Sequence, residues 1–179
     1  MIETISREPS LFPLVAFDQI SLQDANRCLR LWSHAMGELH RPMNGSVLSG
    51  GGDVAHGLIH DGRVVGVCTT STLITPHVAG HPNMTRANTV ELSRLCAEQR
   101  DICRVVLRLW RLFVFESLPH EFAISYQDRA LHRGDLYRFD GWEKIATSRS
   151  GTDKRSGRKG RNKNVWAWPR SKPTNSGGQ

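Results

Sequence analysis

The stretch from Phe122 to Trp142, FAISYQDRALHRGDLYRFDGW, constrains the fold of this chain more than any other. Its first residues alternate between apolar and small or polar side chains, which predicts a half-buried strand. Asp128 then stands where a helix N-cap would stand, and Gly141 is suited to end that helix in a left-handed turn. The apolar positions of the predicted helix are Leu131, Leu136 and Phe139. Because strand-to-helix junctions bind ligands in open α/β folds, we interpret this junction as a candidate active site.

Two strands and a tight turn are predicted upstream of this stretch. Residues 54–59 and 63–70 are apolar runs, and the residues between them include Asp61 and Gly62. An Asp-Gly pair between two apolar runs is typical of a β-hairpin. A third strand is predicted over residues 87–96, with Leu92 and Arg94 on one face and Ser93 and Leu95 on the other.

Two longer helices are predicted from caps and periodicity. Ser21 and Asp24 form a capping-box pattern before an apolar stripe, which predicts a helix over residues 22–36. Asp101 is the expected cap of a long helix that Pro119 closes. Its expected buried stripe consists of Ile102, Val105, Val106, Leu109, Leu112 and Phe113.

The remaining segments complete a single domain over residues 1–169. Residues 1–17 are expected to be irregular and HVAGHPN, residues 77–83, to be a loop. Strands are predicted over 143–148 and 165–168, with Trp166 and Trp168 on one face, and a disordered tail over 170–179. A hairpin that precedes a strand–helix–strand–helix–strand unit predicts an α/β (α+β) fold with a mixed sheet flanked by helices.

Composition narrows the class of protein. The 179 residues have a mean hydropathy of −0.40 and no apolar run long enough to span a membrane, as expected for a soluble domain. The start of the chain lacks a basic region followed by an apolar one, and the four cysteines show no C-x-x-C spacing. Both features favour a cytoplasmic protein with reduced thiols.

Positive charge is concentrated in one segment. The net charge is +7, and residues 149–163 carry seven Lys or Arg against one Asp, which leaves +1 for the rest of the chain. Glycine and serine separate the charges, as in a loop that follows a phosphate backbone. We interpret the segment as a nucleic-acid contact, with a solvated loop as the alternative. The residues expected to bind DNA are Lys154, Arg155, Arg158, Lys159, Arg161 and Lys163, together with His132.

The order of elements resembles the GNAT acyltransferase superfamily. More closely, VELSRL at 90–95, ISYQD at 124–128, His132, Gly134 and YRFDGW at 137–142 resemble the Mom DNA-modification proteins of bacteriophages. The resemblance covers about residues 54–148 and implies a GNAT-like, mostly antiparallel sheet. It also implies transfer of a carbamoylmethyl group to the exocyclic amine of adenine in double-stranded DNA, which protects that DNA from restriction in a bacterial host cytoplasm. The target adenine would be flipped out of the duplex.

The resemblance implies roles for several residues. Tyr137 stands where GNAT enzymes carry a tyrosine that protonates the leaving group, and His34 lies in a helix region where some Mom-like proteins have a histidine. Asp128 is a candidate base for the amine, with the N-cap as its alternative role. Arg94, next to Ser93, can hold a carboxylate or phosphate, or form an ion pair with an acid. Tyr126 stacks on the base or belongs to the core.

The group donor is left open by the sequence. GNAT enzymes that use acyl-CoA carry a glycine-rich loop for the pyrophosphate, whereas residues 98–104 here, EQRDICR, contain no glycine and two acids. An iron site built from His34, His40, Asp128 and His132 is a further alternative, with scattered surface histidines as the simpler interpretation. Two other functions compete with DNA modification: a conventional N-acyltransferase for a small molecule, protein or tRNA, and a DNA-binding domain without catalysis.

Overall fold

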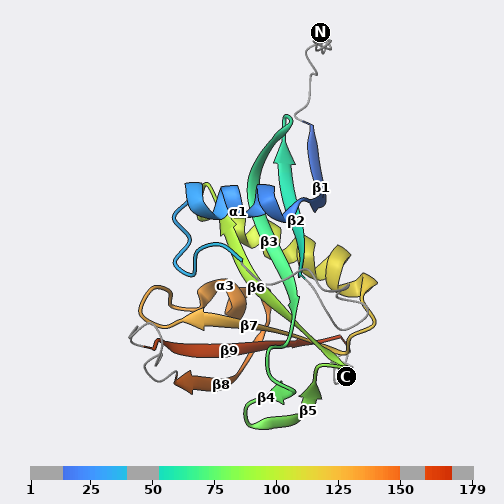
Figure 1. Ribbon diagram of the computed structural model, residues 1–179, viewed down its shortest axis with the longest axis vertical. Coiled ribbons are helices and arrows are strands. Elements are labelled where there is room, and N and C mark those ends of the chain that lie inside the picture. Colours follow the sequence, from blue (N-terminus) through green and yellow to red (C-terminus); the bar gives the residue numbers. More distant parts are fainter. Residues whose placement is uncertain (1–13, 40–52, 150–159, 171–179) are drawn as a thin grey trace, which may run out of the picture.

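A seven-stranded sheet forms the centre of the computed structural model, which describes residues 14–39, 53–149 and 160–170 (Figure 1). The strand order is β1-β2-β3-β6-β7-β9-β8. The strands are β1 Val15–Ile20, β2 Asp53–His60, β3 Arg63–Thr72, β6 Thr89–Ala97, β7 Phe122–Asp128, β8 Glu143–Arg149 and β9 Asn162–Pro169. Only β6 and β7 are parallel neighbours, and the other pairs are antiparallel. The predicted fold class is confirmed.

The parallel pair opens toward its carboxyl ends. Pairing between β6 and β7 stops at Glu91 and Ile124, although β6 continues to Ala97 and β7 to Asp128. Beyond this point β6 stays paired with β3, and β7 stays paired with β9. In Figure 1, β2 and β3 accordingly run nearly vertically while β7, β8 and β9 run nearly horizontally. The two halves of the sheet therefore diverge at the junction that the sequence singled out.

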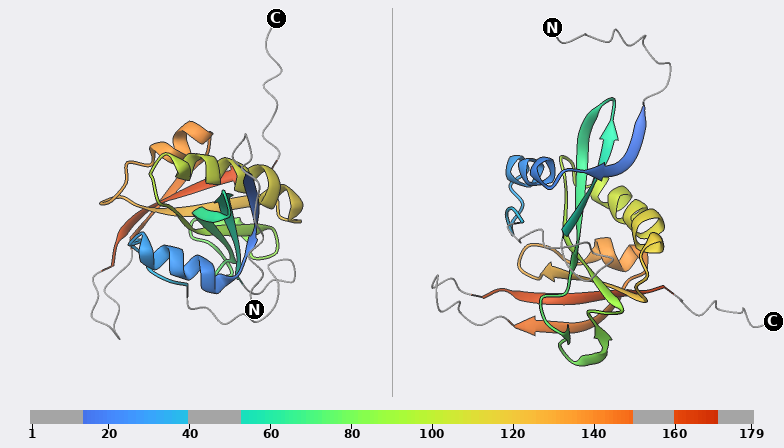
Figure 2. Two further views of the ribbon diagram at one scale, coloured as in Figure 1. Left: turned by 90° about the horizontal axis from the view of Figure 1, so that it is seen from above. Right: turned by 45° about the vertical axis from the view of Figure 1, so that its right-hand side comes forward.

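Three helices cover the sheet. Helix α1, Leu22–Leu31, lies on one face, while α2, Ile102–Leu109, and the short α3, Asp135–Asp140, lie on the other (Figure 2). The Ser21 hydroxyl accepts a hydrogen bond from the Asp24 amide at 3.0 Å, so the predicted cap of α1 is confirmed. The helix ends at Leu31, before the predicted end at residue 36, because the chain turns at Ser33 with a φ of 51°.

Each face of the sheet has its own hydrophobic core. The first lies under α2 and α3, and its largest side chains are Trp110, Phe115, Tyr137, Trp142 and Trp166. The second lies on the opposite face, where the hairpin of β4, His77–Val78, and β5, His81–Thr85, packs on Ile124 and Val165. Trp168 packs against the same cluster as Trp166, which confirms that both share a face.

Two elements in the described part escaped the sequence-based prediction. The segment around β1 and the loop HVAGHPN were expected to be irregular, but they form β1 and the β4–β5 hairpin. β1 is an edge strand with no buried residue, so its sequence shows no alternation of apolar side chains. Strand β4 has only two residues, which is too short for any periodic signal.

The long helix predicted after Asp101 is present, but the prediction of its buried residues is partly wrong. After Leu109 the chain continues as a π-helical turn, Trp110–Val114, and a 3-10 turn, Phe115–Ser117. A π-helical turn takes an extra residue, which rotates the buried face. The buried residues are Val106, Leu107, Trp110, Val114 and Phe115, whereas Val105, Leu112 and Phe113 are exposed. Asp101 makes no side-chain hydrogen bond to the helix, so it does not cap α2 as expected.

The helix after β7 starts later than predicted. Residues 129–131 form a turn, residues 132–133 have no regular structure, and α3 begins after Gly134, whose φ is 85°. Asp128 is therefore not an N-cap; its Oδ1 accepts a hydrogen bond from the Ala130 amide at 2.9 Å and closes the turn. Leu131 and Phe139 are exposed, contrary to expectation. Gly141 ends the helix with a φ of 87°, which confirms its predicted role.

The C-terminal boundary is marked by Arg170, which the sequence placed in the disordered tail. Its amide donates to the Glu121 carbonyl at 2.8 Å, and its guanidinium lies 5.2 Å from the Phe115 ring centroid. The rest of the predicted tail lies outside the described residues.

Gly66 sets the distance between β3 and α2. A Cβ at this position would lie 2.6 Å from Cγ2 of Val106 and 3.1 Å from Cγ2 of Ile102. We expect Gly66→Ala to lower the free energy of unfolding by about 1–3 kcal/mol, because an added methyl overpacks the core. Urea unfolding measures this loss. The double variant Gly66→Ala/Val106→Ala should be less destabilised than the sum of the single variants, and simple additivity would contradict this explanation.

Candidate active site

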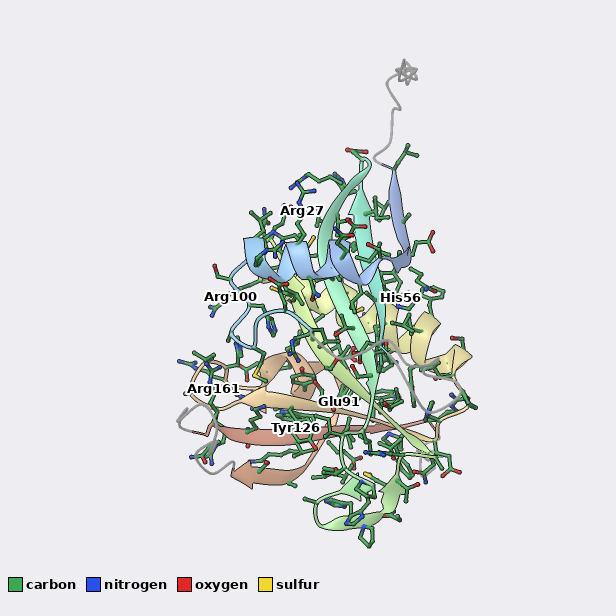
Figure 3. All side chains as sticks on the ribbon, viewed as in Figure 1. Arg27, His56, Glu91, Arg100, Tyr126 and Arg161 are labelled. Atoms are coloured by element: carbon green, nitrogen blue, oxygen red, sulfur yellow. The ribbon has the colours of Figure 1, made fainter. Side chains whose placement is uncertain are left out.

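A cavity of about 700 Å³ occupies the gap between the diverging ends of β6 and β7. Its walls come from the segment after α1, residues 34–36, from β6, from the start of α2, from β7 and from residues 131–137. Of the residues expected from the sequence, His34, Ser93, Arg94, Tyr126, Asp128, His132, Tyr137 and Lys163 line it. Figure 3 shows Arg100 and Arg161 at the outer side of this gap, with Glu91 nearer to the point where the strands meet.

A β-bulge at Ser93 shapes the β6 wall. Thr69 is opposite Arg94 and Thr70 is opposite Leu92, so Ser93 is the extra residue. Its hydroxyl is bonded to the hydroxyls of Thr69 at 2.9 Å and Ser71 at 2.6 Å. The bulge reverses the alternation, so Leu95 packs against the same core as Leu92 instead of on the opposite face, which corrects the predicted faces.

Arg94 connects the β6 wall to the segment after α1. Its Nε donates to the Gly37 carbonyl at 3.1 Å, and its Nη1 donates to the Ser93 carbonyl at 2.8 Å. These bonds fix the guanidinium at the cavity wall and bring the 34–36 segment over the cavity.

Tyr137 is the best-fixed polar group of the cavity. Its hydroxyl lies 2.8 Å from Oγ of Ser125, and Ser125 donates its only hydrogen to the Leu92 carbonyl at 2.9 Å. The Tyr137 hydroxyl must therefore be the donor in the bond to Ser125. The Tyr137 ring stacks on Trp166, with centroids 5.6 Å apart. Burial raises the pKa of Tyr137 to about 12, so the group keeps its proton at neutral pH.

Asp128 lies at the end of β7 and is 8% exposed. Its Oδ2 is 3.3 Å from Nη1 of Arg161, which also donates to the Ala35 carbonyl at 3.4 Å. Arg161 thus connects the start of β9 to the carboxylate and to the segment after α1. The carboxylate is held in one position at the cavity wall.

Lys163 and Tyr126 come from neighbouring strands on one side of the cavity. The Lys163 ammonium lies 5.9 Å from the Tyr126 ring centroid. Burial lowers the pKa of Lys163, and the nearby Glu91 opposes this effect. Tyr126 packs against the second core, as one of the two interpretations predicts, and it also lines the cavity; stacking on a base stays a prediction.

His34 is uncharged at neutral pH. Burial, followed by the charges of Arg94 and His132, lowers the pKa of His34 to about 4. Its Nδ1 accepts a hydrogen bond from the Met36 amide at 3.2 Å, so the proton of the neutral ring sits on Nε2. His34 therefore presents an N–H donor to the cavity, which suits binding better than proton abstraction.

We expect protein stability to depend on pH through His34. Because its pKa is lower in the folded than in the unfolded chain, the stabilisation is complete above about pH 6.5 and is lost between there and about pH 4. The loss is on the order of 1–3 kcal/mol. Urea unfolding of the wild type and His34→Gln at pH 7 and pH 4.5 measures it. An equal loss of stability in both proteins would contradict the assignment.

The sequence-based reasoning missed the arginines around the cavity mouth. Arg100, Arg104 and Arg133 line the cavity, and none of them is among the site residues expected from the sequence. The four-residue spacing of Arg100 and Arg104 at a helix start was the available signal. Glu98 pairs with Arg63, so one of the two acids thought to repel a pyrophosphate is already neutralised.

The backbone amides at the start of α2 already donate hydrogen bonds within the chain. Those of Ile102, Cys103 and Arg104 donate to the carbonyls of Gln99, Arg100 and Asp101, at 3.2 Å in each case. A phosphate at this helix would therefore meet arginine side chains in place of a glycine-lined backbone cradle.

Four of the residues expected to bind DNA belong to the middle of the basic segment. Lys154, Arg155, Arg158 and Lys159 lie outside the described residues. The two ends of the segment are described: Arg149 pairs with Asn162, and the Arg129 amide donates to the Asn162 carbonyl at 3.1 Å. The second end of the segment thus rejoins the sheet beside Asp128, while Arg149 lies one strand further away, on β8.

A metal centre was one alternative for the histidines. Within the described ranges, no group of three or more His, Cys, Asp or Glu side chains is arranged to hold a metal ion. His40 of the postulated iron site is not among the described residues. Likewise, no helix in the part of the chain that the structure covers has the length and apolarity needed to cross a membrane.

Comparison with known proteins identifies the fold. No family model and no curated protein matches the chain by sequence. Among solved structures, NAA60 of Arabidopsis thaliana bound to a bisubstrate analogue matches with a TM-score of 0.60 and 11% identity, over 87% of this chain and 99% of that one. The same plant protein has also been solved with acetyl-CoA.

Two bacterial structures agree. The ribosomal-protein-S18-alanine N-acetyltransferase of Escherichia coli matches with a TM-score of 0.56 and 12% identity, over 93% of this chain and 100% of that one. A GNAT-family structure from Chromobacterium violaceum matches with a TM-score of 0.59 and 13% identity, over 87% of each chain. The chain has the fold of the GNAT acetyltransferases.

Proposed function

We propose that this protein transfers an acyl group from a thioester donor to an amine. The observation that carries the proposal is the position of Tyr137, whose hydroxyl lies at the wall of a cavity between two parallel strands that have separated. The strand edge of β6 beyond Glu91 is no longer paired with β7 and lines this cavity. An extended donor that contains amide groups can add to such an edge as a further strand.

The residues present fit an acyl-CoA donor. The extended arm fits along β6, and the phosphates fit Arg100 and Arg104, whose guanidinium groups bind phosphate oxygens in pairs. In this proposal the side chains of Arg100 and Arg104 bind the phosphates that a glycine-rich loop binds in GNAT enzymes that use acyl-CoA. A protein of this fold binds acetyl-CoA, which supports the same class of donor here.

The proposed reaction needs two proton transfers. The amine nitrogen forms a bond to the acyl carbon, and the bond between that carbon and sulfur breaks. The Tyr137 hydroxyl turns from Ser125 Oγ and gives its proton to the departing sulfur; as a neutral group it carries no charge before the transfer. Asp128 accepts the proton that the amine loses, and the Arg161 guanidinium holds its carboxylate in position.

DNA adenine is a second candidate acceptor. It is favoured by the position of the basic segment, whose second end contacts Asp128 through Arg161, and by Lys163 in the cavity wall. The exocyclic amine of a flipped adenine is a weak nucleophile that needs a base, and Asp128 is placed to supply one. Protein and small-molecule amines are the simpler acceptors for this fold.

Two measurements test these proposals. Isothermal titration with acetyl-CoA tests the donor, and Arg100→Gln/Arg104→Gln should weaken its binding at least tenfold. Mass spectrometry after incubation with acetyl-CoA tests the acceptor, with duplex DNA, peptides with free N-termini and polyamines offered separately. An adduct on adenine supports DNA modification, and an adduct on a peptide or polyamine supports a conventional acyltransferase. Absence of both donor binding and adducts would reject acyl transfer.

A further inference from the structure

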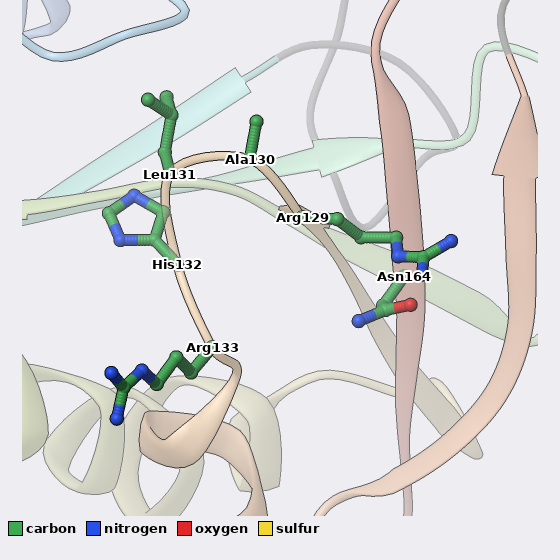
Figure 4. Close-up of a pocket in the computed structure, with 6 residues that line it drawn as sticks. All are labelled: Arg129, Ala130, Leu131, His132, Arg133 and Asn164. Carbon is green, nitrogen blue, oxygen red and sulfur yellow. The ribbon is translucent and has the colours of Figure 1, made fainter.

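A second pocket adjoins the cavity and is not explained by acyl transfer. It has a volume of about 420 Å³ and is lined by Arg129, Ala130, Leu131, His132, Arg133 and Asn164 (Figure 4). Arg129, Ala130 and Asn164 do not line the larger cavity. The two spaces share the wall formed by residues 131–133 and are otherwise distinct.

Trp166 fixes the orientation of the amides behind this pocket. An indole N–H can only donate, so the Gln127 atom that lies 3.2 Å from it is the oxygen Oε1. Gln127 Nε2 then donates to the carbonyls of Asp128 and His132, at 2.7 Å and 2.5 Å. Asn164 Nδ2 donates to the same Oε1 at 2.8 Å, so Asn164 Oδ1 is directed away from Gln127.

Asn164 Oδ1 is a buried acceptor without a hydrogen-bond partner among the described residues. The residue is 9% exposed and lines the pocket. In the view of Figure 4 the amide oxygen lies on the side of the Arg129 guanidinium, and the amide nitrogen lies on the opposite side. A buried acceptor that is unpaired is unfavourable, so this oxygen favours a ligand that brings an N–H donor.

The rest of the lining selects an anion. Arg129 and Arg133 are exposed at the pocket mouth, and the six lining residues include no acid. Exposed guanidinium groups bind phosphate oxygens and stack on flat rings. Ala130 and Leu131 add an apolar surface, with Leu131 47% exposed. A ligand that satisfies all three features carries a phosphate, a flat ring and an N–H donor.

We propose that this pocket binds a nucleotide whose base carries an exocyclic amine. The amine donates to Asn164 Oδ1, the base lies on Ala130 and Leu131, and the phosphate binds Arg129 and Arg133. Because Arg129 is exposed, its side chain moves to admit the base at little cost. The nucleotide comes from the free pool or from a nucleic-acid strand. Binding here does not depend on the proposed acyl transfer.

Cytidine 5′-monophosphate is a suitable probe, since its base is unlike the adenine of acyl-CoA. Its matched control is the 5′-monophosphate of pyrimidin-2-one riboside, which lacks only the amine. We expect the control to bind about tenfold more weakly by isothermal titration, because Asn164 Oδ1 is then left unpaired. The NMR signal of the Asn164 side-chain amide should shift with cytidine monophosphate.

Variants that each remove one positive charge show which pocket binds cytidine monophosphate. Arg129→Gln should weaken binding of cytidine monophosphate several-fold, whereas Arg27→Gln, an exposed change on α1, should leave it unchanged. An octacytidine strand that binds more tightly than the mononucleotide identifies nucleic acid as the source, and equal affinity identifies the free nucleotide. The proposal is overturned if inorganic phosphate binds as tightly as cytidine monophosphate, if removal of the amine has no effect, or if Arg100→Gln but not Arg129→Gln weakens binding.

Discussion

Tyr137→Phe is expected to lower the rate constant of acyl transfer by roughly 10²–10⁴-fold while leaving the affinity for acetyl-CoA nearly unchanged. The hydroxyl is the group that can protonate a departing sulfur, and burial raises its pKa to about 12, so it is fully protonated at neutral pH. Phenylalanine keeps the ring that stacks on Trp166. Steady-state kinetics with the acceptor that mass spectrometry identifies would measure the effect.

A control for this variant comes from a distant buried hydrogen bond. Trp110 Nε1 donates to Thr70 Oγ1 at 2.7 Å, and neither residue lines the cavity. Trp110→Phe therefore also removes one buried hydrogen bond, but it should leave the rate constant within about threefold of the wild type. If Tyr137→Phe retained full activity, Tyr137 would not be the proton donor, and the hydroxyl would serve only to pack α3 against β7.

Trp110→Ala is expected to cost about 3–5 kcal/mol of the free energy of unfolding, the largest stability loss of any single change considered. Trp110 is fully buried at the centre of the first core. Its ring stacks on Phe115 and Trp142, with centroids 5.9 Å and 6.2 Å apart. Removing the indole leaves a cavity in the core. It also removes the N–H group that donates to Thr70 Oγ1, so this buried hydroxyl loses its hydrogen-bond donor.

Urea unfolding of three proteins separates these contributions. Trp110→Phe keeps most of the volume and should lose about 1–3 kcal/mol, mainly from the unpaired Thr70 hydroxyl and the smaller ring. The additional loss in Trp110→Ala then measures the cavity. Equal stability of the two variants would show that packing of the aromatic ring contributes little, contrary to the position of Trp110 against Phe115 and Trp142.

Much of the fold was predictable because its strands carry strong local patterns. The hairpin at Asp61–Gly62, the alternation in β7 and the Gly141 helix end follow from neighbouring residues alone. The start of α3 was not predictable in this way. The Asp128 carboxylate favours either a helix cap or a tight turn, and Gly134, six residues later, provides the better helix start. The bulge at Ser93 also depends on its hydroxyl partners in β3.

The candidate site, like the fold, was predictable only where its residues are close together in the sequence. The sequence brought Asp128, His132 and Tyr137 together because they lie within one short stretch. His34 and Arg94 reach the same cavity only because the guanidinium binds the carbonyl of Gly37, a contact between residues 57 positions apart. Arg133 escaped prediction because a single exposed arginine in a loop carries no periodic signal; its importance, like that of Arg100, depends on where β6 and β7 separate.

Hydrogen exchange with acetyl-CoA tests the central claim, that the donor binds between the separated ends of β6 and β7. We expect slower exchange of amides in residues 92–97 and 99–104 on saturation with acetyl-CoA, with the β4–β5 hairpin unchanged. Unaltered exchange at β6 in the presence of saturating acetyl-CoA, or protection confined to other parts of the chain, would contradict it.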